Sequence, residues 1–254
     1  MALNGERHVL VVAGSDSSGG AGIARDIETI AAHGLRSCVA VAAVTVQTHD
    51  EVRRIASLPP EIVADQMRAA IASNDVAAIK IGMLAGGETI AAVACVLADH
   101  PTVPVVLDPV LAASSGASLL EAGGLDQLRE LLFPRCMLLT PNLPELARLA
   151  GATGQAEGEE AAIRQAGRML ATGAAAVLVK GGHAAGHAAI DILVTRDAQP
   201  CRFAAPRLPV TMRGTGCMLS SAIAAGLAGG LDVAAAIGAA KGYLNTKLEA
   251  HVAS

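Results

Sequence analysis

The sequence contains two glycine-rich segments of the kind that can surround a small ligand or an anion. The first, residues 14–22 (Gly-Ser-Asp-Ser-Ser-Gly-Gly-Ala-Gly), follows a predicted strand and precedes a predicted helix. It has the glycine separation of a P-loop, but Gly20 and Ala21 stand where that motif needs Lys and Ser or Thr. It also lacks the GxGxxG spacing of a dinucleotide fold. The segment is therefore either a tight loop that lets backbone approach a small ligand, or a flexible turn.

The second segment, residues 213–218 (Arg-Gly-Thr-Gly-Cys-Met), opens a predicted helix. The backbone N–H groups of Gly214, Thr215 and Gly216 can converge on an anion there, and the helix dipole adds positive potential at the same point. This combination suits a phosphoryl group in transfer. Cys217 lies in the first turn, where a thiol can have a lowered pKa and act as a base or nucleophile. The alternative is that Cys217 is one more small buried residue.

Two carboxylates and one lysine stand at predicted strand ends or helix starts, where α/β proteins collect ligands. Asp108 ends the run Val-Val-Leu at 105–107, and Glu145 follows Thr-Pro-Asn-Leu-Pro at 140–144. Both could bind hydrated magnesium, and each could equally be a helix cap or loop residue. Lys180 precedes two glycines and could hold a nucleotide phosphate or be an ordinary surface lysine.

Alternating strand and helix patterns position these residues. Apolar runs rich in Val, Ile and Leu predict buried strands, and Ala- and Leu-rich stretches with helical spacing predict the helices between them. We expect a mainly parallel sheet covered on both faces. The predicted strands are 8–13, 37–46, 77–81, 103–107, 136–140, 175–180 and 190–194, and the predicted helices are 22–32, 60–73, 87–99, 121–132, 157–171, 214–228 and 232–250.

Composition limits the remaining possibilities. A chain of 254 residues without a low-complexity linker predicts one α/β domain over 1–254. Five widely spaced cysteines without a CxxC pair, and no signal-like or membrane-spanning apolar segment, predict a reduced cytoplasmic location. The net charge is −4 and the chain has no basic stripe interleaved with aromatics, which argues against a nucleic-acid partner.

Taken together, the motifs resemble the hydroxymethylpyrimidine and phosphomethylpyrimidine kinases, a branch of the ribokinase-like superfamily. The set is ordered along most of the chain and is far more specific than any single member. The resembling segments are 13–23, Val46-Gln47-Thr48, Lys80-Ile81-Gly82-Met83-Leu84, Leu107-Asp108-Pro109-Val110, 140–145, Lys180-Gly181-Gly182-His183 and Gly214-Thr215-Gly216-Cys217.

The resemblance implies a ribokinase-like three-layer α/β/α sandwich that uses ATP and Mg2+ to phosphorylate hydroxymethylpyrimidine, and in many members its monophosphate, for thiamine synthesis. Cys217 matches the residue that takes the substrate proton, and Gly214, Thr215 and Gly216 match the anion hole. The pyrimidine pocket positions are Gly14, Asp26, Gln47, Met83 and Val110; the ATP positions are Asn142, Lys180, Gly182 and Thr211; and the magnesium positions are Asp108 and Glu145. Relatives of this fold often form homodimers, although no residue here identifies an interface.

Three positions depart from the family pattern. Ser17 stands where the family generally has Pro, Arg213 replaces a usual His, and Met218 replaces a usual Thr. Arg213 could add a phosphate contact or alter substrate choice. Two alternatives therefore stay open: a pyridoxal or pyridoxine kinase, and a pyrimidine-binding sensor that has lost turnover.

Overall fold

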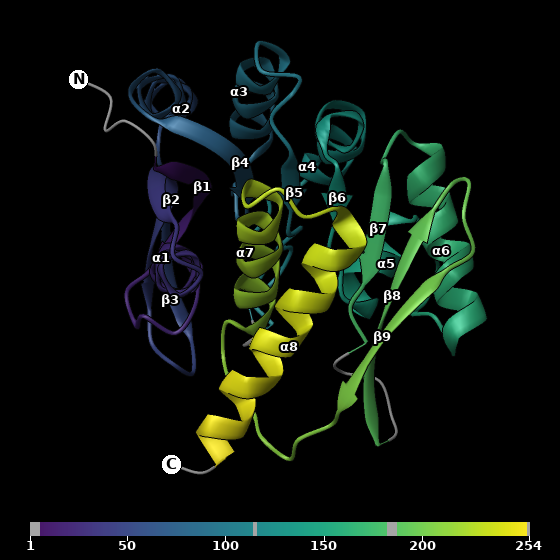
Figure 1. The fold of residues 1–254 in the computed structure, drawn as a ribbon. Coiled ribbons are helices and arrows are strands. Elements are labelled where there is room, and N and C mark those ends of the chain that lie inside the picture. Colours follow the sequence, from purple (N-terminus) through teal and green to yellow (C-terminus); the bar gives the residue numbers. More distant parts are fainter. Residues whose placement is uncertain (1–5, 114–115, 182–186, 253–254) are drawn as a thin grey trace.

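One nine-stranded sheet organises the chain in the computed structural model, which describes residues 6–113, 116–181 and 187–252 (Figure 1). The strand order is β3-β2-β1-β4-β5-β6-β7-β8-β9. The strands are β1 (Arg7–Asp16), β2 (Arg36–Gln47), β3 (Val52–Ser57), β4 (Asp75–Ile81), β5 (Val105–Leu107), β6 (Leu138–Leu139), β7 (Ala176–Val179), β8 (Ala188–Thr195) and β9 (Cys201–Pro206).

The six strands β2, β1, β4, β5, β6 and β7, in sheet order, run parallel to one another. The pairs β2–β3, β7–β8 and β8–β9 are antiparallel. The inner strands β1, β4, β5, β6 and β7 are mostly buried on both faces, which explains why their sequences are continuous apolar runs rather than alternating ones. The expected mainly parallel sheet is confirmed.

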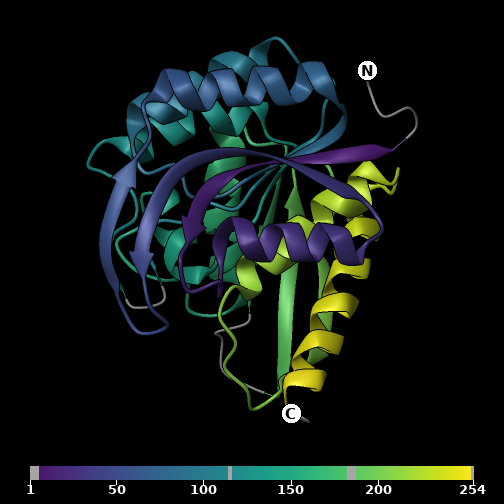
Figure 2. The ribbon, with the colours of Figure 1, turned by 90° about the vertical axis from the view of Figure 1, so that its left-hand side faces the viewer.

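Helices cover both faces of this sheet and give three layers (Figure 2). Along β1, Leu10 and Val12 face α2, α3, α5 and α6, whereas Val9 and Val11 face α1, α7 and α8. The helices are α1 (Gly22–Ala32), α2 (Pro60–Ser73), α3 (Gly87–Ala98), α4 (Gly124–Gln127), α5 (Leu143–Leu149), α6 (Glu159–Ala171), α7 (Thr215–Ala228) and α8 (Val233–Val252), with a π-helical turn η1 (Leu128–Leu132) and a 3-10 turn η2 (Phe133–Arg135) after α4.

Three elements were absent from the sequence prediction, and one predicted helix is irregular. Strands β3 and β9 lie at the two edges of the sheet with mostly exposed residues, so they lack the apolar runs of the inner strands. Helix α5 has only seven residues and begins with a proline-containing turn that reads as a loop. The stretch predicted as a helix at 121–132 instead starts at Gly124 and continues into η1.

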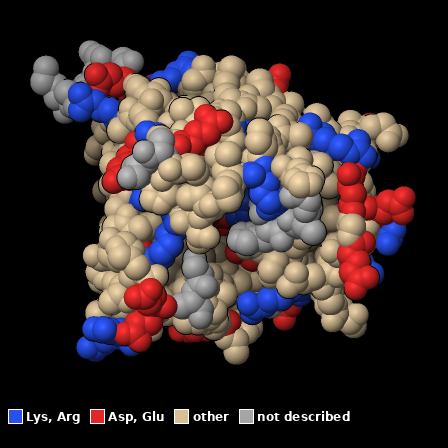
Figure 3. Space-filling view, turned by 90° about the horizontal axis from the view of Figure 1, so that it is seen from below, with Lys and Arg blue, Asp and Glu red and all other residues tan. Residues whose placement is uncertain are grey.

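The carboxyl ends of the parallel strands meet at one edge of the sheet, where α7 also begins (Figures 1 and 2). Figure 3 looks onto this edge, where acidic and basic side chains are interspersed rather than gathered into a patch of one sign. None of the helices in the described part of the chain is long and apolar enough to cross a membrane.

Candidate active site

A buried ion pair joins the ends of β5 and β7. The Lys180 ammonium donates to Asp108 Oδ1 at 2.7 Å, and the hydroxyls of Thr140 and Ser220 donate to the same carboxylate at 3.3 Å each. Burial alone would raise the pKa of Asp108, but the two nearby ammonium groups, of Lys180 and Lys80, hold it below its ordinary value. Asp108 is therefore an ionised carboxylate 2% exposed at the edge of the sheet.

Glu145 lies on the other side of the same lysine, with its Oε2 at 3.9 Å from Lys180 Nζ. It also closes a capping box at the start of α5: its Oε2 accepts from the backbone N–H of Asn142, and Asn142 Oδ1 accepts from the Glu145 N–H, both at 2.8 Å. The helix-cap alternative for Glu145 is thus realised, together with its place beside Lys180. Burial raises the pKa of Glu145, although the charge of Lys180 opposes the rise.

The first turn of α7 faces this cluster. A Cβ atom added to Gly216 would lie 3.2 Å from Lys180 Nζ, a tight contact, and 3.5 Å from Asp108 Oδ2, an ordinary van der Waals contact. The backbone of Gly216 therefore lies directly beside both charged groups. Gly214 has a left-handed φ of 74°, and a Cβ on it would lie 2.4 Å from the carbonyl oxygen of Gly20. The two glycine-rich segments of the sequence are therefore packed against each other, which only glycine permits at position 214.

Cys217 follows on the same turn and is partly exposed. The expectation of a lowered thiol pKa is wrong: burial raises the pKa of Cys217 to about 11, with a further contribution from the carboxylates of Asp26 and Asp108. The Lys80 ammonium and the backbone N–H of Gly22 act in the opposite direction without outweighing burial. Burial therefore decides the direction of the shift in the pKa of this thiol.

A second buried ion pair lies beneath α7. Lys80 Nζ donates to both carboxylate oxygens of Asp26 at 2.8 Å, and the Ser221 hydroxyl donates to Asp26 Oδ1 at 2.8 Å. Both charged side chains are 0% exposed. Burial alone would lower the pKa of Lys80, but Asp26 reverses this and raises it, so Lys80 is cationic. Asp26, expected at the pyrimidine pocket, therefore has all its carboxylate oxygens engaged inside the protein.

The other expected pocket residues lie at the ends of β1, β2, β4 and β5. Met83 packs against Gly14, where an added Cβ would lie 3.0 Å from its sulfur. Val110 belongs to the same small apolar cluster as Met83. Gln47 ends β2, where its side-chain Oε1 accepts from Thr45 Oγ1 at 3.3 Å and its backbone bonds to Ser17.

Two expected ATP positions are not part of these contacts. Thr211 is exposed in the segment before α7, and Gly182 lies outside the described residues. Conversely, sequence reasoning gave no role to Lys80, Thr140, Ser220 or Ser221. The only signal for the serines was helical spacing, three and four residues beyond Cys217.

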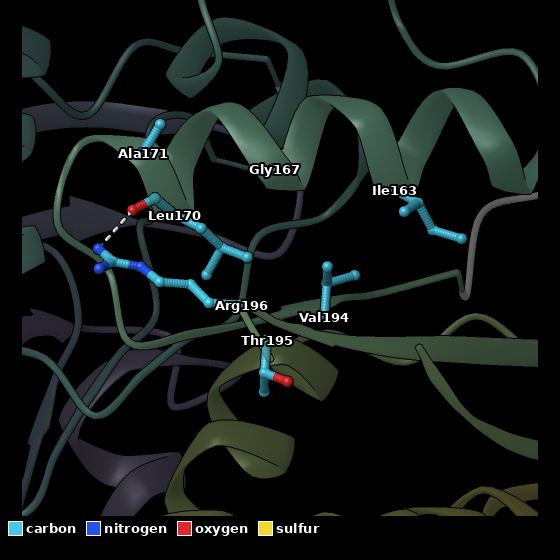
Figure 4. Close-up of a pocket in the computed structure, with 7 residues that line it drawn as sticks. All are labelled: Ile163, Gly167, Leu170, Ala171, Val194, Thr195 and Arg196. Atoms are coloured by element: carbon cyan, nitrogen blue, oxygen red, sulfur yellow. Dashed lines mark hydrogen bonds between the residues drawn. The ribbon is translucent and has the colours of Figure 1, made fainter. Parts of the chain in front are cut away.

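A surface pocket between α6 and the end of β8 is separate from this cluster (Figure 4). Arg196 crosses it to donate to the carbonyl oxygen of Leu170 at 2.8 Å. None of the expected site residues lines it. Its lining residues are Ile163, Gly167, Leu170, Ala171, Val194, Thr195 and Arg196.

Comparisons with known proteins agree with this arrangement. A sequence model of the phosphomethylpyrimidine kinase family matches residues 16–254. The chain is 43% identical to a hydroxymethylpyrimidine/phosphomethylpyrimidine kinase of Rhizobium meliloti over 95% of this chain and 90% of that protein. It is 42% identical to the thiamine biosynthesis bifunctional protein ThiED of Geobacter sulfurreducens over 94% of this chain, and it spans 49% of that relative's length.

Solved structures show the same fold. A crystal structure of phosphomethylpyrimidine kinase from Clostridium difficile superposes with a TM-score of 0.82 at 31% identity, over 96% of this chain and 100% of that one. An ADP complex of Bacillus subtilis pyridoxal kinase superposes with a TM-score of 0.85 at 28% identity, over 94% and 90%. Backbone similarity does not separate the two activities, whereas sequence identity favours the pyrimidine kinases.

A three-layer sandwich with lysines, carboxylates and a glycine-rich helix start at one edge of its sheet is a ribokinase-like small-molecule kinase. The bound ADP of the pyridoxal kinase neighbour supports ATP as the nucleotide. Within this class, the chain belongs to the phosphomethylpyrimidine kinase family.

Proposed function

We propose that the chain transfers the γ-phosphoryl group of ATP to 4-amino-5-hydroxymethyl-2-methylpyrimidine, and then to the resulting monophosphate, in thiamine biosynthesis or salvage. The observation that carries this proposal is the meeting of Lys180, Asp108 and the Gly214–Cys217 turn at the carboxyl edge, in a chain 43% identical to a kinase with that name. The apolar cluster around Met83 would hold the ring, and Gln47 would pair with its polar edge through an amide that both donates and accepts.

Asp26 would serve the pocket indirectly. Its carboxylate is held by Lys80 and Ser221, so it fixes α1 against β4 and α7 rather than presenting a free oxygen. Because Ser221 lies one helical turn after Cys217, this buried pair supports the backbone that carries the thiol.

Cys217 would act as the base. Its sulfur takes the proton of the hydroxymethyl group, the freed oxygen forms a bond to the γ-phosphorus, and the bond between that phosphorus and the β,γ-bridging oxygen breaks to release ADP. The N–H groups at the start of α7 would stabilise charge on the transferred group, with Lys180 beside them. Asn142, Gly182 and Thr211 are the further proposed ATP positions.

We propose that Asp108 and Glu145 would hold a magnesium ion, for which carboxylate oxygens are suitable ligands. Asp108 and Glu145 bring two carboxylates within 4 Å of one Lys180 ammonium, so this point already stabilises positive charge between acidic oxygens. Magnesium is commonly held by one or two carboxylates together with phosphate oxygens, and when bound it neutralises phosphate charge. Replacing Glu145 by Gln keeps the capping-box acceptor, so we expect a higher magnesium concentration for half-maximal activity without loss of α5.

The decisive experiment measures ATP-to-ADP turnover with magnesium and with hydroxymethylpyrimidine, its monophosphate, pyridoxal or no acceptor. We expect turnover with both pyrimidines and its loss in Cys217→Ala. Turnover with pyridoxal alone would assign the chain to the vitamin B6 kinases, and pyrimidine binding without turnover on any acceptor would identify a sensor.

We further propose that the chain acts in the cytoplasm and forms a homodimer. The free thiols of Cys38, Cys95, Cys136, Cys201 and Cys217 suit a reducing compartment. Light scattering of the purified protein would give the mass of the assembly, and a mass of one chain would contradict the dimer.

A further inference from the structure

Strands β2 and β3 form a hairpin, and two side chains from outside this hairpin form hydrogen bonds to the backbone at its turn. Gln47 is the last residue of β2 and pairs with Val52 of β3, and Thr48 and His49 follow it in the connection between the two strands. Ser17 belongs to the first glycine-rich segment, and Arg213 is the first residue of the second. We call these two side chains the hairpin clamp.

Ser17 holds the backbone of Gln47 from both sides. Its hydroxyl donates to the Gln47 carbonyl oxygen and accepts from the Gln47 N–H, each at 2.8 Å. Because the residue is exposed, these bonds compete with water, but together they fix both polar groups of one peptide residue. These two bonds therefore fix the direction in which the Gln47 side chain leaves the backbone, relative to the first glycine-rich segment.

Arg213 holds the next residues of the same connection. Its Nη1 donates to the Thr48 carbonyl oxygen at 3.0 Å and to Ser18 Oγ at 2.9 Å, and it lies 3.4 Å from His49 Nδ1. Its Nη2 donates to Asp16 Oδ2 at 3.2 Å. Its side chain is 18% exposed and that of Asp16 is 5% exposed, so solvent screens this ion pair only partly.

These bonds indicate that Arg213 holds other parts of the protein, whereas the sequence had suggested that it could contact a phosphate. Both terminal nitrogens of the guanidinium are directed to acceptors of the protein. The residue is also peptide-bonded to Gly214, whose position against Gly20 is fixed by close contact. The side chain of Arg213 therefore links the start of α7 to Thr48, the residue that follows Gln47.

We propose that the hairpin clamp sets the position of Gln47 relative to the Gly214–Cys217 turn. Ser17 and Arg213 are then positioning residues that determine which molecule accepts the phosphoryl group. This proposal rests on the proposed function, in which Gln47 pairs with the polar edge of the pyrimidine. Its two residues are positions where this chain departs from the family pattern. Neither the usual Pro, which has no hydroxyl, nor the usual His, which is shorter and lacks the guanidinium fork, can make the same bonds.

The test compares Ser17→Ala, Arg213→His and the double variant with wild type. Arg53→His, an exposed residue of the same hairpin, and Ser73→Ala, an exposed serine of α2, are the matched controls. Two readouts are needed: the KM of hydroxymethylpyrimidine, pyridoxal and ATP, and hydrogen exchange of backbone amides in residues 44–54. The second readout does not depend on catalysis.

For Arg213→His we expect an increase of about tenfold in the pyrimidine KM, the scale of one charge-assisted hydrogen bond. The ATP KM should stay within about twofold, the preference for pyrimidine over pyridoxal should fall, and the exchange of residues 47–50 should accelerate. Since both side chains hold one segment, the double variant should lose less than the product of the single losses. Arg213→Lys, which keeps the charge but not the fork, should recover part of the loss.

Two results would overturn the clamp. One is unchanged exchange in residues 44–54 of both single variants. The other is a raised ATP KM in Arg213→His with an unchanged acceptor KM, which would place Arg213 at the nucleotide phosphates. If wild type turns over no pyrimidine, the proposed function fails, and the exchange measurement still decides whether the clamp holds the hairpin.

Discussion

At the scale of the residue, the pKa of Cys217 is shifted upward, whereas its place at a helix start suggested a downward shift. Burial and two carboxylates raise the thiol pKa to about 11. At neutral pH, therefore, only about one molecule in 10⁴ carries the thiolate in the free protein. A base with so small an ionised fraction makes catalysis strongly dependent on pH.

We expect kcat/KM to rise about tenfold per pH unit between pH 7 and 9, because kcat/KM reports ionisations of the free enzyme. The raised pKa places the midpoint above this range, and the active form is the deprotonated one. Cys217→Ala should lower kcat by about 10²–10⁴-fold, and Cys217→Asp should abolish the slope because an ordinary Asp is ionised throughout. Cys95→Ala, at an exposed cysteine, is the control. A flat wild-type profile would contradict Cys217 as the base.

Gly214 permits a second prediction at this scale. Its φ of 74° and the short approach to Gly20 would both resist a side chain. Gly34 has nearly the same φ, 73°, with nothing within 4 Å of an added Cβ. Gly34→Ala should therefore cost about 1–2 kcal/mol of the free energy of unfolding and leave activity intact. Gly214→Ala should cost more and lower kcat by about 10²-fold; equal effects of the two changes on stability and kcat would refute the close-packing argument.

Much of the site could be located from the sequence, but not its connections. Asp108, Glu145 and Lys180 were found because each follows a recognisable strand, and strand ends converge in parallel sheets. The pairing of Asp26 with Lys80 spans 54 residues and obeys no local spacing. The same is true of Arg213, whose bonds reach residues almost 200 positions away.

At the scale of the element, the sheet and the last helix meet at a buried ion pair close to the backbone that follows Lys180. Lys241 of α8 donates to Asp191 Oδ2 at 2.6 Å, and Asp191 Oδ1 accepts from the Gly181 N–H at 2.9 Å. Gly181 follows Lys180, so α8 is connected through β8 to the backbone that carries this lysine.

The inner strands were predictable because burial on both faces gives them apolar runs, whereas β3 and β9 were not, because edge strands mix exposed and half-buried residues.

Lys241→Met should cost about 3–5 kcal/mol of the free energy of unfolding, since it leaves Asp191 buried without its cation. The ATP KM should increase because Gly181 loses a fixed acceptor, and Asp191→Leu combined with Lys241→Met should recover part of the stability. Lys247→Met, an exposed position on α8, should change stability by less than about 0.5 kcal/mol. Denaturant unfolding and initial rates measure both effects. A stable Lys241→Met variant with an unchanged ATP KM would contradict this connection.

At the scale of the whole molecule, residues from both ends of the chain share one core. The cluster on the α1, α7 and α8 side of the sheet includes Val9 and Val11 of the first strand together with Ile237 and Ala240 of the last helix. The two glycine-rich segments, nearly 200 residues apart, touch at Gly20 and Gly214. The two larger apolar clusters therefore each draw on both halves of the described chain.

We accordingly expect one cooperative unfolding transition, as for a single domain. Far-UV circular dichroism reports all helices, whereas the one tyrosine, Tyr243, reports the packing of α8 against His33 at the end of α1. The two signals should give the same midpoint in denaturant. A tyrosine transition at lower denaturant would show that α8 separates from the rest first.

The position of α7 in the sequence also affects the order in which a growing chain can fold. Asp26, Lys80 and the inner strands leave the ribosome well before Ser221, which completes their buried pair from α7. At ordinary rates of protein synthesis, the interval between residues 80 and 221 lasts on the order of ten seconds. During that time the apolar face of β1 and β4 that α7 later covers is open to water, and to any chaperone that recognises such a surface.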